Sequence, residues 1–358
     1  MPRVKETDMT AFPTTPRWIV LSDEAQALED IYFFLPAMAA LRKEGTRVER
    51  FETRRWKFSP KLAQARLTGA CLLIARSLGR EWIEMLEAHR EQHGRICYLV
   101  DHLYSPEPLA AEQGTSTSEA GAESEAAQLQ QRLFALADEV VVVSEQLEAA
   151  LASLRPKVSL LTPPLTGKLP DLHHLEQSDW CIGFHGTLAH REDILTLAPV
   201  LRDIQTRHSD SEVELMMGRH LPLALSDISR LKTMEAVSWE AFQDYCSRRR
   251  IAIGLAPLME NSDNRAASWL RFLDITRMGG VGIYSRRAPY ADLIEDGVDG
   301  LLVGDDPTEW TAALERLLGD RDATRAMAHN AQHKAHEVGD PLRVLDFWRA
   351  RSTVARPR

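Results

Sequence analysis

Short apolar runs alternate with longer stretches of helical periodicity along the chain. Runs of this length are typical of strands that are buried on both faces of a parallel sheet. The pattern predicts strands at 18–21, 47–51, 70–75, 96–100, 140–143, 158–161, 180–184, 213–217, 251–255, 281–284 and 300–303. Strands that alternate with helices indicate βαβ units, so we expect an α/β fold built from two Rossmann-like domains.

Changes in composition divide this pattern into segments. We expect a flexible leader at 1–16, an N-terminal Rossmann-like domain at 17–162, a proline-containing linker at 163–179, a C-terminal domain at 180–338 and a C-terminal helix at 339–358 that can cross back to the N-terminal domain. The length of 358 residues also favours two domains, because single hydrophobic cores stop growing at about 250–300 residues.

Two segments have a composition of their own. Residues 105–130 are rich in Pro, Glu, Ala, Gly, Ser and Thr and contain almost nothing to bury. We therefore expect a mobile or partly helical insertion there. Residues 320–351 have the pattern of one long helical tail, with the tandem aromatics Phe347 and Trp348 near its end.

Composition and charge restrict the possible functions. The formal net charge of −9 disfavours a general nucleic-acid binder, which needs a dominant basic surface, but it leaves room for a local basic pocket. The sequence does not indicate a required divalent metal. Its four cysteines form no CxxC pair and indicate reduced thiols rather than a zinc site or a disulfide framework: Cys71, Cys97, Cys181 and Cys246.

The sequence also bears on location. The first residues carry charges and prolines where a secretory signal needs an apolar core. No run approaches the ~20 apolar residues of a membrane-spanning helix. We expect a cytoplasmic protein, with peripheral contact to a membrane left open.

The segment 182–193 leads from a predicted strand through a glycine turn into the start of a helix. Backbone N–H groups at such a turn can bind an anion, and Gly186 allows a phosphate to approach closely. His190 lies in the same turn. The alternatives are an ordinary α/β turn and, for the residues that follow His190, a normal charged helix opening.

The segment 251–285 has the order strand, polar loop, helix, glycine turn and strand. Ser268, Arg271 and Asp274 recur at every third residue, so on a helix they share one face, and Arg265 precedes them. A guanidinium offers forked donors to phosphate oxygens, and a carboxylate can accept hydrogen bonds from two sugar hydroxyls. This set suits an anionic, polyhydroxylated ligand. The alternative is a solvated helix face with an i,i+3 ion pair.

Three sequence blocks, taken together, resemble a known family. They are GFHGTLAHREDI, IGLAPLMENSDNRAASWLRFLD and GVGIYSRRAPYADLIEDGVDGLLVGDDPTEWTAALERLL. In this order they resemble the C-terminal, donor-binding domain of GT-B glycosyltransferases of the retaining E-x7-E type, over about 180–320. The resemblance implies two Rossmann-like domains that face a central cleft, and a nucleotide-diphosphate sugar as the donor.

The resemblance also implies roles for single residues. Gly186 and Thr187 would face the phosphates, Arg271 would contact the diphosphate, and Asp274 stands where the family has its second glutamate, which contacts the ribose. The first glutamate position falls on Ala266, so the motif is degenerate. The complete donor-binding set that we predict is Gly186, Thr187, His190, Arg265, Ser268, Arg271 and Asp274.

In the N-terminal half, Asp101 and His102 directly follow the predicted strand 96–100. We expect them to be the catalytic pair, with His102 donating to the sugar or phosphate and Asp101 contacting the acceptor. The alternative is a loop carboxylate with a hydrogen-bonded histidine.

The resemblance predicts a retaining hexosyltransferase of bacterial surface-glycan or glycoconjugate synthesis, with a glycan, a lipid-linked saccharide or a protein as acceptor. The alternative is a non-catalytic GT-B protein that binds a nucleotide sugar or a partner transferase. A GT-B epimerase or phosphorylase is a further class, and the absence of a cofactor-lysine motif weakens the phosphorylase reading.

Overall fold

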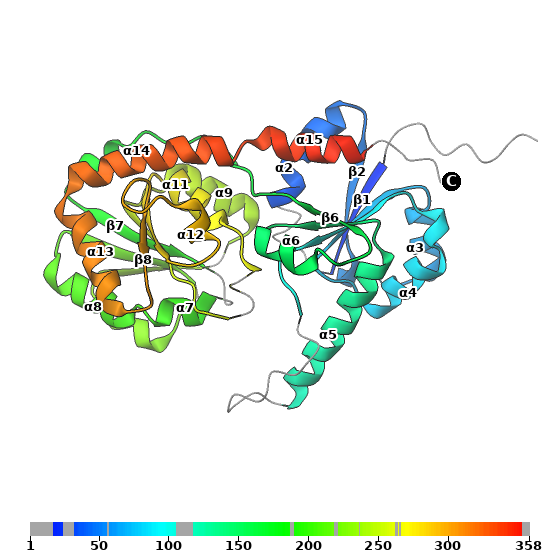
Figure 1. The fold of residues 1–358 in the computed structure, drawn as a ribbon, viewed down its shortest axis with the longest axis horizontal. Helices are drawn as coiled ribbons and strands as arrows, with labels where there is room; N and C mark the ends of the chain where they lie inside the picture. The colour runs from blue at the N-terminus through cyan, green and yellow to red at the C-terminus, as the bar shows by residue number, and fades with distance from the viewer. Residues whose placement is uncertain are drawn as a thin grey trace, which may run out of the picture. The chain divides into compact units, whose positions relative to one another are not determined.

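The computed structural model describes residues 17–23, 32–55, 57–104, 117–186, 190–217, 221–235, 237–261, 264 and 266–352, without the side chains of 117–124, 239 and 240. The chain forms two compact units (Figure 1). Unit 1 comprises Met1–Val143, Glu148–Leu161 and Leu342–Arg358, and unit 2 comprises Ser144–Leu147 and Thr162–Pro341.

Unit 1 contains a six-stranded parallel sheet in the order β2-β1-β3-β4-β5-β6. Its strands are β1 (Arg17–Ser22), β2 (Arg47–Glu52), β3 (Cys71–Ala75), β4 (Ile96–Val100), β5 (Glu139–Val142) and β6 (Lys157–Leu160). The helices that accompany this sheet in the chain are α2 (Leu35–Lys43), α3 (Pro60–Leu67), α4 (Arg80–Ala88), α5 (Thr117–Leu136), α6 (Glu145–Leu151) and α15 (Pro341–Arg351). Every residue of β3 and β4 is buried, which explains their unbroken apolar sequences.

Unit 2 contains a second parallel sheet in the order β12-β11-β10-β7-β8-β9. Its strands are β7 (Trp180–His185), β8 (Ser211–Met216), β9 (Leu231–Met234), β10 (Ile253–Ala256), β11 (Val281–Ser285) and β12 (Leu301–Val303). The helices are α7 (Arg191–Leu195), α8 (Ala198–Arg207), α9 (Trp239–Arg248), α11 (Leu270–Arg277), α12 (Tyr290–Leu293), α13 (Pro307–Gly319) and α14 (Arg321–Val338). The predicted α/β fold with two parallel sheets is confirmed.

Close packing in unit 2 fixes the helix that carries the predicted donor residues. A Cβ atom added at Gly254 in β10 would lie 2.4 Å from Cγ1 of Ile275 in α11. Only glycine therefore allows α11 to lie this close to β10, and Phe272 and Leu273 of the same helix are buried.

The structure departs from the predicted elements in three places. The strand β9 was not predicted, because its LKTM sequence is short and partly exposed and only its backbone pairing with β8 defines it. Within the segment expected to be a mobile or partly helical insertion, the part from Thr117 onward belongs to α5, and 105–116 lie outside the described residues. The tail expected to be a single helix is divided into α14 and α15, because Gly339 ends the first and Pro341 begins the second.

The last helix, α15, packs against β1 and the start of α2 within unit 1 (Figure 1). Trp348 is fully buried, and its ring centroid lies 5.6 Å from that of Trp18 and 5.0 Å from that of Phe34. Its Nε1 donates to the carbonyl of Phe33 at 2.5 Å, and Nε1 of Trp18 donates to Oγ of Ser352 at 2.9 Å. The end of the chain is therefore part of the core of unit 1.

We predict that Trp348→Ala destabilises unit 1 by about 3–5 kcal/mol, because it removes a buried aromatic side chain and leaves a cavity. Urea unfolding followed by circular dichroism measures this change. Leu342→Ala, at a position of the same helix that is 60% exposed, is the control and should change stability by less than ~0.5 kcal/mol. Equal losses for the two variants would contradict the packing described for α15.

Candidate functional site

The carboxyl edge of the unit 2 sheet contains the predicted glycine turn. The strand β7 ends at His185, Gly186 follows, and α7 begins at Arg191 with His190 as its N-cap. A Cβ added at Gly186 would lie 2.7 Å from the Phe184 ring and 3.3 Å from the His190 Cβ, so only glycine fits here. Thr187 lies outside the described residues.

Arg271 lies near the start of α11, and its guanidinium packs over the ring of Phe184, with 5.2 Å between Cζ and the ring centroid. Both Nη atoms are buried, and no described residue accepts a hydrogen bond from them. A cation–π contact attracts the charge but leaves the N–H donors unsatisfied. The guanidinium is therefore available as a forked donor for an anion at the end of β7.

His190 is neutral in this setting. Burial lowers the pKa of its imidazole to about 2, and the charge of Arg271 acts in the same direction. The ring therefore adds no positive charge near physiological pH, and a neutral imidazole has one N–H to donate.

Asp193 is a residue of this edge that sequence reasoning missed. Its side chain is buried, and its Oδ1 accepts hydrogen bonds from the Met259 backbone N–H at 2.8 Å and from Asn264 Nδ2 at 2.9 Å. Asn264 Nδ2 also donates to the Met259 carbonyl at 2.9 Å. Asp193 thereby ties α7 to the loop after β10. In the sequence it reads as one acid of a charged helix opening, which gives no sign of burial.

The other predicted donor residues have different surroundings. Asp274 lies one turn after Arg271, and its Oδ1 accepts from Arg277 Nη1 at 3.3 Å. Arg277 is itself buried and donates through Nη2 to Gln243 Oε1 at 2.6 Å. Ser268 does not share their helix face as predicted, because α11 begins only at Leu270.

Two positions of the predicted motif remain. Arg265 lies outside the described residues. Ala266, at the place of the first family glutamate, is buried and offers no side-chain oxygen.

Tyr290, at the start of α12, is fully buried close to the charged residues of this edge. Burial raises the pKa of its phenol to about 12, with Arg271 opposing the shift and Asp193 and Asp274 adding to it.

A second polar cluster surrounds the carboxylate of Glu214 and includes His185, the residue directly before Gly186. His185 Nε2 contacts Glu214 Oε1 at 3.0 Å, Arg249 Nε donates to Oε2 at 2.7 Å, and the Tyr245 hydroxyl donates to Oε1. Burial alone would raise the pKa of Glu214, but the hydrogen bonds from His185 and Tyr245 and the charge of Arg249 outweigh it and hold the pKa at about 2. This cluster fixes His185 directly before Gly186.

In unit 1, the predicted catalytic pair directly follows β4. His102 Nδ1 is hydrogen-bonded to Asp101 Oδ1, and its ring meets that of Tyr104 edge-on at 4.5 Å. Gln130 of α5 donates to the His102 carbonyl at 3.0 Å and accepts from the Tyr104 N–H at 3.0 Å. The loop that carries the pair is thus held against α5.

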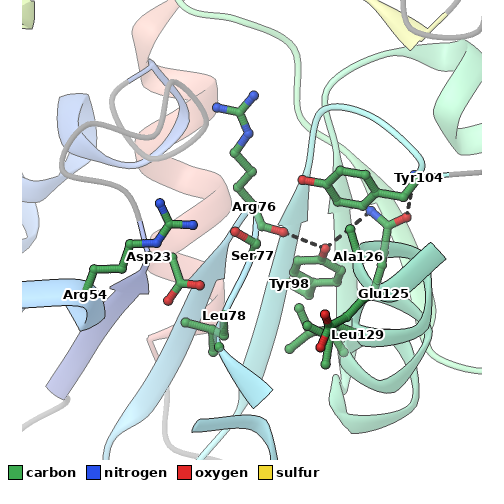
Figure 2. Close-up of a pocket in the computed structure, with 13 residues that line it drawn as sticks. Asp23, Arg54, Arg76, Ser77, Leu78, Tyr98, Tyr104, Glu125, Ala126 and Leu129 are labelled. Carbon is green, nitrogen blue, oxygen red and sulfur yellow. Dashed lines mark hydrogen bonds between the residues drawn. The ribbon is translucent and has the colours of Figure 1, made fainter. Parts of the chain in front are cut away.

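A cavity of about 290 Å³ lies at the same edge of the unit 1 sheet (Figure 2). Figure 2 shows Asp23 and Arg54 on one side of it and Tyr98 and Tyr104 on the other. The Tyr98 hydroxyl donates to the Arg76 carbonyl at 2.8 Å. The complete lining is Asp23, Arg54, Arg76, Ser77, Leu78, Gly79, Tyr98, Tyr104, Glu125, Ala126, Leu129, Gln130 and Leu133.

Arg76, which lines this cavity, has a left-handed backbone with φ of 67°. A non-glycine residue adopts this conformation at an energetic cost, and such residues cluster at binding and catalytic sites. Because the lining combines charged groups with aromatic and aliphatic surface, the cavity suits a small amphipathic ligand with polar edges.

Two kinds of feature are absent from the described part of the chain. No cluster of three or more His, Cys, Asp or Glu side chains there could hold a metal ion. None of its helices combines the length and the apolar character needed to cross a bilayer.

Comparison with known proteins identifies the fold. No protein-family model matches the chain, and no curated protein matches its sequence. Among solved structures it is similar to Anabaena HepE in complex with UDP and glucose, with a TM-score of 0.63, 12% identity and coverage of 94% of this chain and 99% of that one. It is also similar to a glycosyltransferase from Rickettsia africae, with a TM-score of 0.65, 11% identity and coverage of 95% of this chain and 98% of that one. For sucrose-phosphate synthase from Thermosynechococcus elongatus the TM-score is 0.61, the identity 15% and the coverage 94% of this chain and 98% of that one.

The chain therefore has the GT-B fold, as the sequence predicted. At these identities the similarity establishes the fold alone. The assignment to the retaining E-x7-E type stays a prediction.

The Glu214 cluster predicts a specific pH dependence. Because folding lowers the pKa of Glu214 from its usual 4.5 to about 2, its stabilisation is complete above pH 4.5 and is lost as the pH falls toward 2. The stability difference between the wild type and Glu214→Gln should therefore be largest above pH 4.5 and shrink below it. Thermal unfolding over a pH series measures the difference. A difference independent of pH, as expected for the exposed control Glu235→Gln, would contradict this description.

Proposed function

We propose that the chain is a glycosyltransferase that moves a sugar from a nucleotide-diphosphate sugar to an acceptor. The observation that carries the proposal is the buried Arg271 guanidinium, whose Nη atoms have no acceptor within the described residues. It lies at the carboxyl edge of a parallel sheet, where open α/β folds bind ligands. The GT-B fold and the UDP and UDP-glucose complexes of HepE lend further support.

Arg271 would bind the diphosphate. Its two Nη groups can form a bidentate contact with phosphate oxygens, and they lie beside the Phe184 ring, which directly precedes the turn at Gly186 in β7. His190, which burial holds neutral, belongs to the same proposed donor set and adds no second positive charge. Thr187, Arg265, Ser268 and Asp274 belong to the same proposed donor set, on the resemblance of their positions.

The reaction would require no protein nucleophile. The bond between the anomeric carbon and the diphosphate oxygen breaks, and the acceptor oxygen forms a new bond to that carbon. In a retaining transfer the acceptor arrives on the face that the diphosphate leaves, and a phosphate oxygen takes the acceptor's proton. Arg271 would stabilise the negative charge that develops on the leaving diphosphate, which lowers the barrier to bond breaking.

The acceptor would bind in unit 1. We propose that its reactive end occupies the cavity of Figure 2, beside the Asp101 and His102 pair. The ring of Tyr104 can pack on a sugar face, and the side chains of Asp23 and Arg54 can hydrogen-bond to hydroxyls. A glycan, a lipid-linked saccharide or a protein-attached sugar fits this description. The proposed setting is bacterial surface-glycan or glycoconjugate synthesis in the cytoplasm, with no metal required.

One observation favours a second candidate function. Ala266 provides no carboxylate where the resembling family keeps its first glutamate, which places the transferred sugar. A chain that binds the nucleotide sugar without transferring it would serve as a binding protein or as a partner of an active transferase. Release of free nucleotide from the sugar donor in the presence of acceptors distinguishes the two functions.

We predict that UDP or GDP raises the thermal stability of the wild type, by about 2.7 kcal/mol at one hundred times the dissociation constant. Arg271→Ala should weaken nucleotide binding about tenfold or more, because a charge-assisted hydrogen bond contributes about 1.5–3 kcal/mol. Differential scanning fluorimetry with increasing nucleotide measures both effects.

Arg248→Ala is the matched control, since this arginine of the same unit is exposed on α9. It should bind nucleotide as the wild type does. The donor site is refuted if no nucleotide stabilises the wild type, or if the two variants bind equally well.

The proposed acceptor site predicts a separate effect. Ala126 lines the unit 1 cavity, whereas Gln128 is exposed on the same helix and does not line it. Ala126→Trp should fill the cavity and abolish acceptor-dependent nucleotide release from a panel of glycan, lipid-linked and glycopeptide acceptors. Nucleotide binding should stay unchanged, because the donor residues belong to unit 2. Gln128→Trp should retain transfer, and full activity of Ala126→Trp would remove the cavity from the proposal.

A further inference from the structure

The carboxylate of Asp193 lies among the ends of adjacent strands in unit 2. Asp193 belongs to α7, which follows β7, and its Oδ1 accepts from Met259 and Asn264 in the loop after the neighbouring strand β10. Arg271 lies near the start of α11, which follows the same loop in the chain. The carboxylate therefore lies in the same part of the unit as the proposed diphosphate ligand Arg271.

Of the two oxygens of this carboxylate, only Oδ1 accepts hydrogen bonds from the described residues. Asp193 is 2% exposed, yet its Oδ2 has no hydrogen-bond partner within the described residues. A buried carboxylate oxygen without a donor is destabilising, and native structures rarely keep one without a reason. The two Nη atoms of Arg271 are buried and unsatisfied in the same way. A ligand that brings both an anion and hydroxyl groups would satisfy the two residues together.

A nucleotide-diphosphate sugar has this chemistry. Its phosphates carry only acceptors, which match the donors of Arg271, and its sugar carries hydroxyl donors, which match a carboxylate oxygen. Ala266 leaves the helix side of the site without a carboxylate at the position where the resembling family has one. Asp193 follows a different strand, β7, and its buried Oδ2 accepts no hydrogen bond from the described residues.

We propose that Asp193 binds the transferred sugar, with Oδ2 accepting a hydrogen bond from one of its hydroxyls, in place of the carboxylate that Ala266 does not supply. This inference rests on the proposed function and names a substrate contact within it. Because Oδ1 of the same carboxylate holds Met259 and Asn264, the contact also couples sugar binding to the loop after β10.

The test separates a sugar contact from a purely structural role. Asp193→Asn keeps an oxygen for Met259 and Asn264 and replaces Oδ2 by an amide. Calorimetric titration compares UDP-glucose with UDP, and GDP-mannose with GDP, on the wild type and the variant. The variant should bind the preferred nucleotide sugar at least fivefold more weakly and bind the corresponding diphosphate within twofold of the wild type.

Two further variants serve as controls. Asn264→Ala weakens the same loop attachment but leaves Oδ2 in place, so it should not discriminate between the sugar nucleotide and the diphosphate. Glu192→Gln changes the exposed neighbouring acid and should behave as the wild type. If Asp193→Asn weakens both ligands equally, or if Asn264→Ala reproduces its selective loss, Asp193 is structural and the inference is overturned.

Donors that each lack one sugar hydroxyl identify the contact. Deletion of the contacted hydroxyl should weaken binding to the wild type at least fivefold and leave binding to Asp193→Asn unchanged, as in a double-mutant cycle. If no hydroxyl deletion weakens binding to the wild type, the inference fails whether or not the variant folds. A wild type that binds UDP or GDP but gains nothing from the sugar overturns this inference alone. A wild type that binds neither diphosphate nor nucleotide sugar overturns the proposed function as well.

Discussion

The buried guanidinium of Arg271 needs hydrogen-bond acceptors that the described residues do not provide. Its charge is partly compensated by the ring of Phe184, but its two Nη groups have no acceptor in the described part of the chain. Burying a cation is unfavourable unless it is paired and hydrogen-bonded, so a site of this kind favours an incoming anion. The surroundings are consistent with that role, because burial holds His190 neutral and it adds no second positive charge.

Much of the fold could be predicted because burial on both faces of a parallel sheet requires unbroken apolar runs. The predicted strand at 180–184 matches β7, and the one at 281–284 matches β11. The edge strand β9 could not be found in this way, since its side chains are partly exposed and its identity depends on backbone pairing. Gly339 and Pro341 are typical of a helix end followed by a new helix start. The helical periodicity continues on both sides of them, so the sequence was interpreted as one helix.

The candidate site was less predictable, because ion pairing and burial are tertiary properties. A three-residue spacing suggested that Arg271 and Asp274 act together, but Asp274 has Arg277 as a buried partner and Arg271 has none among the described residues. Ser268 fits the spacing, yet it precedes the helix. Asp193 had no distinguishing signal, since an acid in the first turn of a helix is ordinary and only the fold shows that it is buried.

A crystal structure of the wild type with bound UDP or GDP tests the central claim most directly. The claim predicts phosphate oxygens within hydrogen-bonding distance, about 2.7–2.9 Å, of both Nη atoms of Arg271 at the end of β7. A nucleotide bound elsewhere, or a bound diphosphate with Arg271 turned to a protein carboxylate instead, would contradict it.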